Sequence, residues 1–224
     1  LNGTLQTALS AIASEQAAPT ASTMAKVKQI LDYVASNEEP VLTYSASDMV
    51  LAGHSDGSYL SERNARSRAG GHWFLSNNST DPPFNGAILN ISQIIKAVMS
   101  SAAEAELGAL FINAREAAYI RKILIEMGHP QPRTPLQTDN STAEGVVNKN
   151  VQTKKLKSMD MRYHWLRDRE SQGQFRIYWR PGKTNRADYW SKTQHPPAHH
   201  ADMRRQILTP LRILLELRKQ KARQ

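Results

Sequence analysis

The chain of 224 residues contains no cysteine, which excludes a disulfide framework and a metal site built on thiolates. No run of eighteen apolar residues occurs, so a membrane-spanning helix is excluded and no membrane partner is expected. The start of the sequence also lacks the basic, apolar and small-residue segments of a secretory signal. The sequence contains no internal repeats and no low-complexity tracts. Because the chain begins with Leu1, we expect a piece of a longer polypeptide. Its 40% of hydrophobic residues suffice for a globular core.

Positive charge is in excess, because 29 lysines and arginines stand against 20 acidic residues and give a net charge of +9. Residues 201–224 alone hold seven basic and two acidic side chains. A second basic cluster consists of Lys149, Lys154, Lys155, Lys157 and Arg162. Polyanions are therefore the expected partners. The alternative is that these basic residues only solubilise exposed helix faces.

Hydrophobic periodicity predicts a mixed sheet flanked by helices, in the order three strands, helix, strand, helices, strand, helix. Strand patterns occupy 40–45 together with 48–60, then 69–77, 85–93, 135–140 and 174–180. Helix patterns occupy 22–36, 99–127, 141–147, 156–172 and 185–192, and the longest is expected to break near Asn113. Residues 195–200 are expected to form a linker with solvated His195, His199 and His200. A basic amphipathic helix, interrupted at Pro210, follows.

Two glutamates lie within an alanine- and leucine-rich helix pattern, "SSAAEAELGAL" at residues 100–110. Residues two apart lie on nearly opposite sides of a helix, so Glu104 and Glu106 cannot both face water. Glu104 shares its side with serines and a glycine, whereas Glu106 lies on the apolar stripe with Ala109 and Leu110. Glu106 is therefore the carboxylate whose position needs a chemical reason.

Three aspartates also occupy positions where a solvated charge is unfavourable. Each of them also has an explanation without a metal ion. Asp56 ends an apolar strand pattern, but an aspartate before glycine is also typical of a turn. Asp139 ends a strand directly before a helix, where capping is the commonest role. Asp188 lies in a short helix that must pack on the sheet, where it also suits the helix dipole.

If these four carboxylates cluster at one end of the sheet, they repel each other unless cations lie between them. Mg²⁺ suits such a set, because it binds carboxylate oxygens, keeps waters and takes further ligands from phosphate. Two such ions about 4 Å apart activate a water on one side of a phosphodiester and stabilise the leaving oxygen on the other. The acids therefore predict metal-dependent phosphodiester chemistry.

Five segments resemble the ribonuclease H domain of copia-type LTR retrotransposon polyproteins. "SDGSY" is similar to its first-strand motif, "SSAAEAELGAL" to its signature helix and "TDNSTA" to its fourth strand with the following helix. "MDMRYHWLRD" is similar to the stretch that this branch shows before its last strand, and "NRADYWSK" to its closing segment. The likeness runs in the correct order from about Met24 to Lys192.

The resemblance implies a ribonuclease H-like α/β fold, a mixed five-stranded sheet flanked by helices, with helical N- and C-terminal extensions. It implies cleavage of the RNA strand of RNA/DNA hybrids during reverse transcription, with two Mg²⁺ ions or with Mn²⁺ in their place. The catalytic and metal-binding residues would be Asp56, Glu106, Asp139 and Asp188. The rest of the reverse transcriptase polyprotein would be a second partner, in cytoplasmic retroelement particles or in the nucleus.

The same resemblance divides the chain into three parts. Residues 1–45 would be the end of the reverse transcriptase thumb and connection, partly helical. Residues 46–195 would form the ribonuclease H-like domain, and residues 196–224 a linker with a basic C-terminal helix.

Contacts with nucleic acid are expected outside the acidic cluster. Phosphates of the DNA strand would be held by Lys154, Lys155, Lys157 and Arg162. Ser58 and Ser141 are candidates for contacts with 2′-hydroxyls. The loop "RPGKTN" offers Lys183 where many ribonucleases H place a mobile histidine, which implies a slower or differently assisted product step.

Two other functions stay open beside the nuclease. The first is a non-catalytic nucleic-acid-binding remnant of a retroelement polyprotein, against which the four intact acids argue. The second is an integrase-type transferase on the same fold. That class would show a late glutamate rather than Glu106 on the first long helix.

Overall fold

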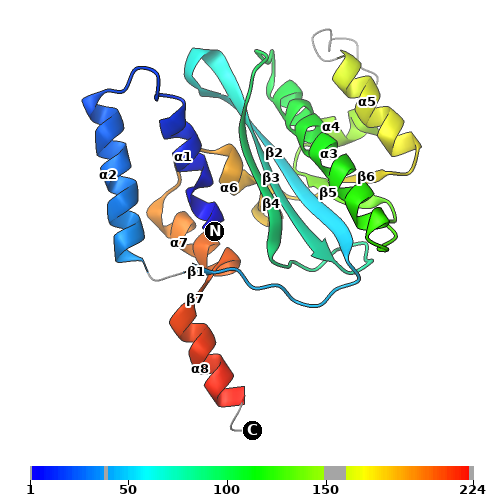
Figure 1. Cartoon of the computed structure of the whole chain (residues 1–224). Helices are drawn as coiled ribbons and strands as arrows, with labels where there is room; N and C mark the ends of the chain where they lie inside the picture. Colours follow the sequence, from blue (N-terminus) through cyan, green and yellow to red (C-terminus); the bar gives the residue numbers. More distant parts are fainter. Residues whose placement is uncertain (1, 38–39, 149–159, 222–224) are drawn as a thin grey trace. The chain divides into compact units, whose positions relative to one another are not determined.

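The computed structural model describes residues 2–37, 40–148 and 160–221, which form two compact units (Figure 1). One unit runs from Ser45 to Lys192, and the other combines residues 1–44 with residues 193–224. All four candidate carboxylates belong to the 45–192 unit.

A mixed sheet organises the 45–192 unit, and within the described residues it has five strands in the order β4-β3-β2-β5-β6. They are β2 (Val50–Glu62), β3 (Arg66–Ser76), β4 (Ala87–Ile95), β5 (Thr134–Thr138) and β6 (Phe175–Trp179). The first three are joined antiparallel, whereas β5 is parallel to both β2 and β6. The mixed five-stranded sheet expected from the periodicity is thereby confirmed.

Helices cover the two faces of this sheet unequally. On one face lie α3 (Ala102–Glu126), α4 (Ser141–Val147) and α5 (Asp160–Ser171), and the short α6 (Asp188–Ser191) lies on the other (Figure 1). Successive residues of β2 point to opposite faces. Ser55 accordingly contacts Asn113 of α3, and Asp56 contacts Ser191 of α6. The core between sheet and helices includes the buried side chains of Leu51, Trp73, Leu110, Leu136 and Phe175.

Both glutamates near the start of α3 are buried, and Glu104 has a structural explanation. The Ser101 hydroxyl accepts a hydrogen bond from the Glu104 N–H (3.2 Å), and the Glu104 carboxylate accepts one from the Ser100 N–H (2.8 Å). These contacts satisfy backbone donors at the helix start. The helix ends before Gly128, whose φ of +88° suits glycine.

The break expected near Asn113 is wrong, because α3 runs unbroken through this residue. Asn113 is fully buried against the sheet, and its side-chain amide donates to Gly70 O (2.9 Å) and to Ala109 O (3.0 Å). Its Oδ1 accepts from Trp73 Nε1 (3.0 Å). Tertiary hydrogen bonds thus outweigh the weak helix propensity of asparagine.

The second unit contains helices and a short two-stranded pairing. Its elements are η1 (Gly3–Leu5), α1 (Gln6–Ala13), α2 (Ala21–Ser36), β1 (Pro40–Val41), α7 (Pro197–Ile207), β7 (Thr209–Pro210) and α8 (Leu211–Lys221). The strand expected over 40–45 is reduced to β1, which pairs antiparallel with β7 and does not join the five-stranded sheet.

The linker expected over 195–200 is wrong from residue 197 onward, because α7 begins at Pro197, a favourable residue for the first helical turn. His199 is exposed as expected, whereas His195 is half-buried. His200 is not solvated, since it is half-buried and its Nε2 lies 3.0 Å from the Tyr33 hydroxyl. In the part of the chain that the structure describes, none of the helices is long and apolar enough to cross a membrane.

Candidate metal centre

Three carboxylates from distant parts of the sequence meet in the 45–192 unit. Asp56, Glu106 and Asp139 each offer an oxygen, and these oxygens lie within 4.8 Å of one another. Asp56 comes from the middle of β2, Glu106 from the beginning of α3, and Asp139 directly follows β5. Such a group of oxygen donors could hold a metal ion.

Gly57 allows α3 to approach β2 at this point. A Cβ atom on this glycine would lie only 2.7 Å from the carbonyl oxygen of Ala105. The Gly57 backbone also donates a hydrogen bond to the Glu106 carboxylate. The strand expected over 48–60 is confirmed and the turn alternative for Asp56 is wrong, because β2 continues through Gly57 to Glu62. The glycine serves a close helix–strand contact instead.

Asp139 does not cap the helix that follows it. The N-cap of α4 is Asn140, whose Oδ1 accepts a hydrogen bond from the Ala143 N–H (2.9 Å). The capping alternative for Asp139 is therefore wrong. Its main-chain carbonyl accepts a hydrogen bond from Trp179 Nε1 (2.9 Å), and its carboxylate faces the other acids.

Asp188 lies beside the three acids but is bound differently. It begins α6, and its Oδ1 accepts a hydrogen bond from the Lys192 ammonium, one helical turn further along. Its negative charge nevertheless acts on Asp56, Glu106 and Asp139, whose pKa values it helps to raise. The structure thus brings three predicted ligands together and places the fourth next to them, paired with a lysine.

Burial and mutual repulsion favour the protonated form of these acids when no cation is present. Burial, together with the charges of Asp139 and Asp188, raises the pKa of Asp56 to about 7, although a hydrogen bond from Ser191 opposes the shift. Burial raises the pKa of Glu106 well above its ordinary value, and the charge of Asp56 adds to this. The pKa of Asp139 is raised for the same reason, burial first.

The residues fit a hard divalent cation. The Glu106 Oε2 atom is buried and has no hydrogen-bond partner in the structure. A buried carboxylate oxygen without a partner is costly, and a cation next to it removes that cost. All three donors are carboxylates, the ligand type that Mg²⁺ and Mn²⁺ prefer. Asp56, Glu106 and Asp139 would therefore hold the ion.

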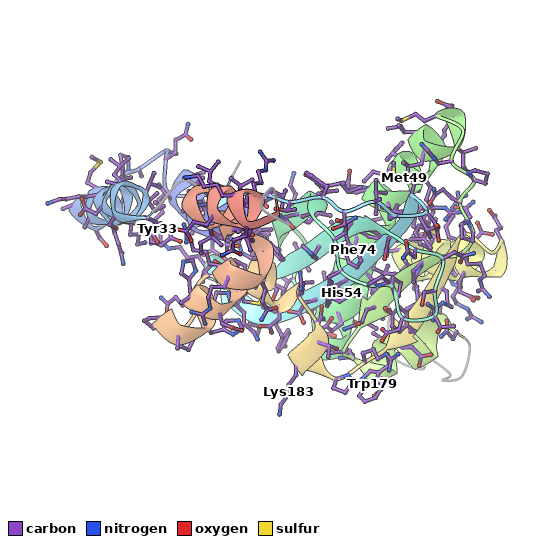
Figure 2. The ribbon with its side chains drawn as sticks, turned by 90° about the horizontal axis from the view of Figure 1, so that it is seen from below. Tyr33, Met49, His54, Phe74, Trp179 and Lys183 are labelled. Carbon is purple, nitrogen blue, oxygen red and sulfur yellow. The ribbon has the colours of Figure 1, made fainter. Side chains whose placement is uncertain are left out.

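A buried histidine, His54, positions the segment that leads to Asp188. His54 and His72 are cross-strand partners on β2 and β3, and burial lowers their pKa values to about 3 and about 4. The neutral His54 accepts a hydrogen bond at Nδ1 from the Arg186 N–H (3.1 Å). Figure 2 shows His54 and Phe74 close together on the sheet, with ring centroids 5.9 Å apart.

The residues predicted to bind nucleic acid lie at several places. Ser58 is half-buried, and its hydroxyl donates to the Ser191 carbonyl (2.7 Å), so it anchors α6. Ser141 is exposed at the start of α4, and Lys183 is exposed in η3 (Gly182–Thr184). Arg162 is half-buried, with its guanidinium 5.7 Å from the Phe111 ring centroid. The predicted Lys154, Lys155 and Lys157 lie outside the described residues.

Sequence reasoning missed three residues that touch the acidic cluster. Ser191 donates a hydrogen bond to Asp56, Lys192 pairs with Asp188, and Trp179 holds the main chain of Asp139. The spacing of four residues between Asp188 and Lys192 in a helical segment is a signal that could have found the lysine. The contacts of Ser191 and Trp179 depend on the tertiary fold.

Comparison with known proteins finds a similar segment in a retroelement polyprotein. No family model matches this chain. The chain is 28% identical over 142 residues to the retrovirus-related Pol polyprotein from transposon TNT 1-94 of Nicotiana tabacum. The match covers 63% of this chain and 10% of the polyprotein, so the chain spans only a small part of that relative. The chain resembles a retrotransposon ribonuclease H domain.

Solved ribonuclease H structures are similar to this domain at low sequence identity. LC11-RNase H1, isolated from compost, is 14% identical, with 63% of this chain and 92% of that chain covered and a TM-score of 0.46. A structure of LC11-RNase H1 in complex with RNA/DNA hybrid is 13% identical, with 62% and 91% covered and a TM-score of 0.45. Prototype foamy virus protease-reverse transcriptase is 14% identical, with 69% and 22% covered and a TM-score of 0.38.

The fold of the domain follows from its own topology. Three antiparallel strands are followed by two parallel ones, and a long helix crosses the sheet beside the central strand β2. The acids sit on β2, on that helix and directly after β5, in the order that the sequence motifs have. This is the ribonuclease H-like fold that the resemblance implies.

Proposed function

We propose that this domain is a metal-dependent endonuclease that hydrolyses the RNA strand of RNA/DNA hybrids during reverse transcription of a copia-type LTR retrotransposon. The observation that carries the proposal is the meeting of Asp56, Glu106 and Asp139, with a buried Glu106 oxygen that lacks a partner. The polyprotein relative supports the retroelement context, and the net charge of +9 supports a polyanionic substrate.

The four acids have defined roles in this proposal. Asp56, Glu106 and Asp139 hold divalent ions, and Asp188 completes the set once its carboxylate turns from Lys192. When bound, two Mg²⁺ or Mn²⁺ ions supply an activated water and stabilise the leaving oxygen. The carboxylates would hold the ions where the RNA phosphate binds, and the buried Asp56 and Glu106 side chains would keep their oxygens in place. The products would be a 3′ hydroxyl and a 5′ phosphate.

The remaining assignments belong to the same proposal. Residues 1–45 are the end of the reverse transcriptase thumb and connection, and residues 196–224 are a basic C-terminal extension that follows the 46–195 domain in the sequence. The domain works on hybrids together with the rest of the polyprotein, in cytoplasmic retroelement particles or in the nucleus.

The decisive experiment incubates the purified chain with labelled RNA/DNA hybrid, duplex DNA and duplex RNA, with Mg²⁺ or with a chelator. Cleavage of hybrid RNA alone, and only with Mg²⁺, is the expected result. Asp139→Asn and Glu106→Gln should abolish cleavage while the thermal unfolding temperature without metal remains at or above that of the wild type, because each removes a carboxylate whose ionised form burial and the neighbouring acids disfavour. Glu116→Gln, an exposed position on the same helix as Glu106, is the matched control.

The outcomes separate the competing functions. Hybrid binding without cleavage by the wild type would favour the non-catalytic remnant, and joining of DNA strands would favour the integrase-type transferase. Cleavage by Asp139→Asn at the wild-type rate would contradict the assignment of the site.

A further inference from the structure

Trp179 is exposed at a position where its strand otherwise buries its side chains. It is the last residue of β6, and the residues two and four positions before it on the same face, Ile177 and Phe175, are buried. The Trp179 side chain is 47% exposed, whereas Trp73 and Trp190 are completely buried. A large aromatic surface is thus left open to solvent at the end of the strand.

The ring is nevertheless held in place. Its Nε1–H donates a hydrogen bond to the main-chain oxygen of Asp139 (2.9 Å), so the indole is attached directly to a residue of the candidate metal centre. An indole that is both exposed and anchored at its polar atom presents its apolar surface in a defined orientation.

A lysine extends from the loop that follows. Gly182, at the start of η3, is so close to the Asp139 carboxylate that a Cβ atom on it would lie 2.7 Å from Oδ2. Lys183 is the next residue and is exposed. In Figure 2, Trp179 and Lys183 lie at the same edge of the domain, and the lysine is directed away from the ribbon. An aromatic surface, anchored on the Asp139 main chain, and a positive charge, one residue after the glycine beside the Asp139 carboxylate, therefore lie near the same residue of the candidate metal centre.

We propose that Trp179 and Lys183 form a binding site for the backbone of the hybrid next to the phosphate to be cut, with the ring packed on a nucleotide sugar and the ammonium paired with a phosphate. This inference rests on the proposed function. The bases of a duplex are stacked inside it, so sugars and phosphates are what a protein surface meets first. A rigid ring suits the apolar side of a sugar, and an ammonium suits the phosphate.

Kinetics with hybrid substrate and Mg²⁺ test the role of the ring. Trp179→Ala should raise KM at least about fivefold, the lower end of what aromatic contacts with nucleic acid provide. Trp179→Phe keeps a ring without the Nε1 donor and should restore most of the affinity. Tyr119→Ala, a 66% exposed aromatic on α3, is the matched control and should leave KM unchanged.

Tryptophan fluorescence gives a readout that a purely structural role would not change. Binding of hybrid should protect part of the tryptophan emission from acrylamide quenching. Ca²⁺ is added with the hybrid because it binds the same oxygen ligands as Mg²⁺. This protection should be absent in Trp179→Phe. In Lys183→Ala the affinity should fall and lose part of its salt dependence.

Two negative results are distinguishable. An unchanged KM in Trp179→Ala, with a wild type that cuts hybrid, would overturn this inference and leave the proposed function intact. A wild type that neither binds nor cuts hybrid would overturn both.

Discussion

The hydroxyl of Ser191 donates a hydrogen bond to Oδ2 of Asp56, although 135 positions separate the two residues in the chain. Both side chains are buried, and Ser191 is held by α6 on the face of the sheet opposite α3. The contact links the closing segment of the domain to the aspartate in the central strand. It stabilises the ionised carboxylate, because it lowers the pKa that burial raises.

Ser191→Ala should therefore weaken metal binding through Asp56. Without the hydroxyl the Asp56 pKa rises above about 7, so at pH 7 a larger fraction of the carboxylate is protonated. We expect the affinity for Mn²⁺ to fall about tenfold at pH 7, as for loss of a hydrogen bond to a charged group, and to recover partly at pH 8.5. Calorimetric titration measures both values. Ser171→Ala, an exposed serine in α5, is the control, and a loss independent of pH would contradict the explanation.

Lys192→Met should have the opposite effect on metal binding. The Lys192 ammonium pairs with Asp188 and also acts on Asp56 and Asp139, so it competes with a divalent ion for the same negative charge. Its removal should increase the affinity for Mn²⁺ about fivefold, the effect expected of a partly exposed charge pair. Lys122→Met removes a lysine of another i, i+4 pair on α3 and should change nothing. Equal or weaker Mn²⁺ binding by Lys192→Met would contradict the competition.

The stability of the metal-free protein should fall as pH rises from about 4 to about 7. The folded state raises the pKa of Asp56 from 3.8 to about 7, so between these values it binds more protons than the unfolded chain. The contribution of Asp56 to the stability of the folded protein is therefore complete below pH 4 and is lost as the pH rises through 7. Mg²⁺ should therefore increase the thermal unfolding temperature more at pH 8 than at pH 5. Scanning calorimetry of the wild type and of Asp56→Asn checks this, since the variant should show a weaker pH dependence.

The periodicity of the sequence predicted the sheet and the helices because a buried strand or helix face must repeat at its own period. It failed where a single residue serves a tertiary contact. Asparagine commonly interrupts helices, but Asn113 forms hydrogen bonds with Gly70 and Trp73 across the core. At Asp56-Gly57 the periodicity was right and the turn that an Asp-Gly pair commonly forms is absent, because Gly57 lets α3 cross β2.

The candidate site could be predicted as far as its chemistry depends on residue type. Glu106 stood out in the sequence because a carboxylate on an apolar helix face needs a partner. The structure agrees, because the Glu106 side chain is buried and its Oε2 atom has no hydrogen-bond partner. The surroundings could not be predicted, because the contacts of Ser191 and Trp179 join segments whose proximity only the fold creates. The charge pattern, likewise, contained no sign that Ser58 would anchor α6 rather than face solvent.

Gly57→Ala and Gly182→Ala should separate the stability of the fold from the geometry of the site. A methyl group at residue 57 would lie 2.7 Å from the Ala105 carbonyl, so α3 must shift. We expect the free energy of unfolding to fall by about 1–3 kcal/mol, as for other overpacked positions. A methyl group at residue 182 meets only the end of the Asp139 side chain, which can rotate.

Gly182→Ala should therefore leave the free energy of unfolding within about 0.5 kcal/mol of the wild-type value, because η3 is exposed. The displaced Asp139 carboxylate should bind Mn²⁺ more weakly, and hybrid cleavage should fall with it. Urea denaturation and calorimetric titration of both variants distinguish the two effects. A Gly182→Ala variant with wild-type Mn²⁺ affinity would show that Asp139 does not bind the ion in the orientation seen here, because the added methyl group cannot coexist with that orientation.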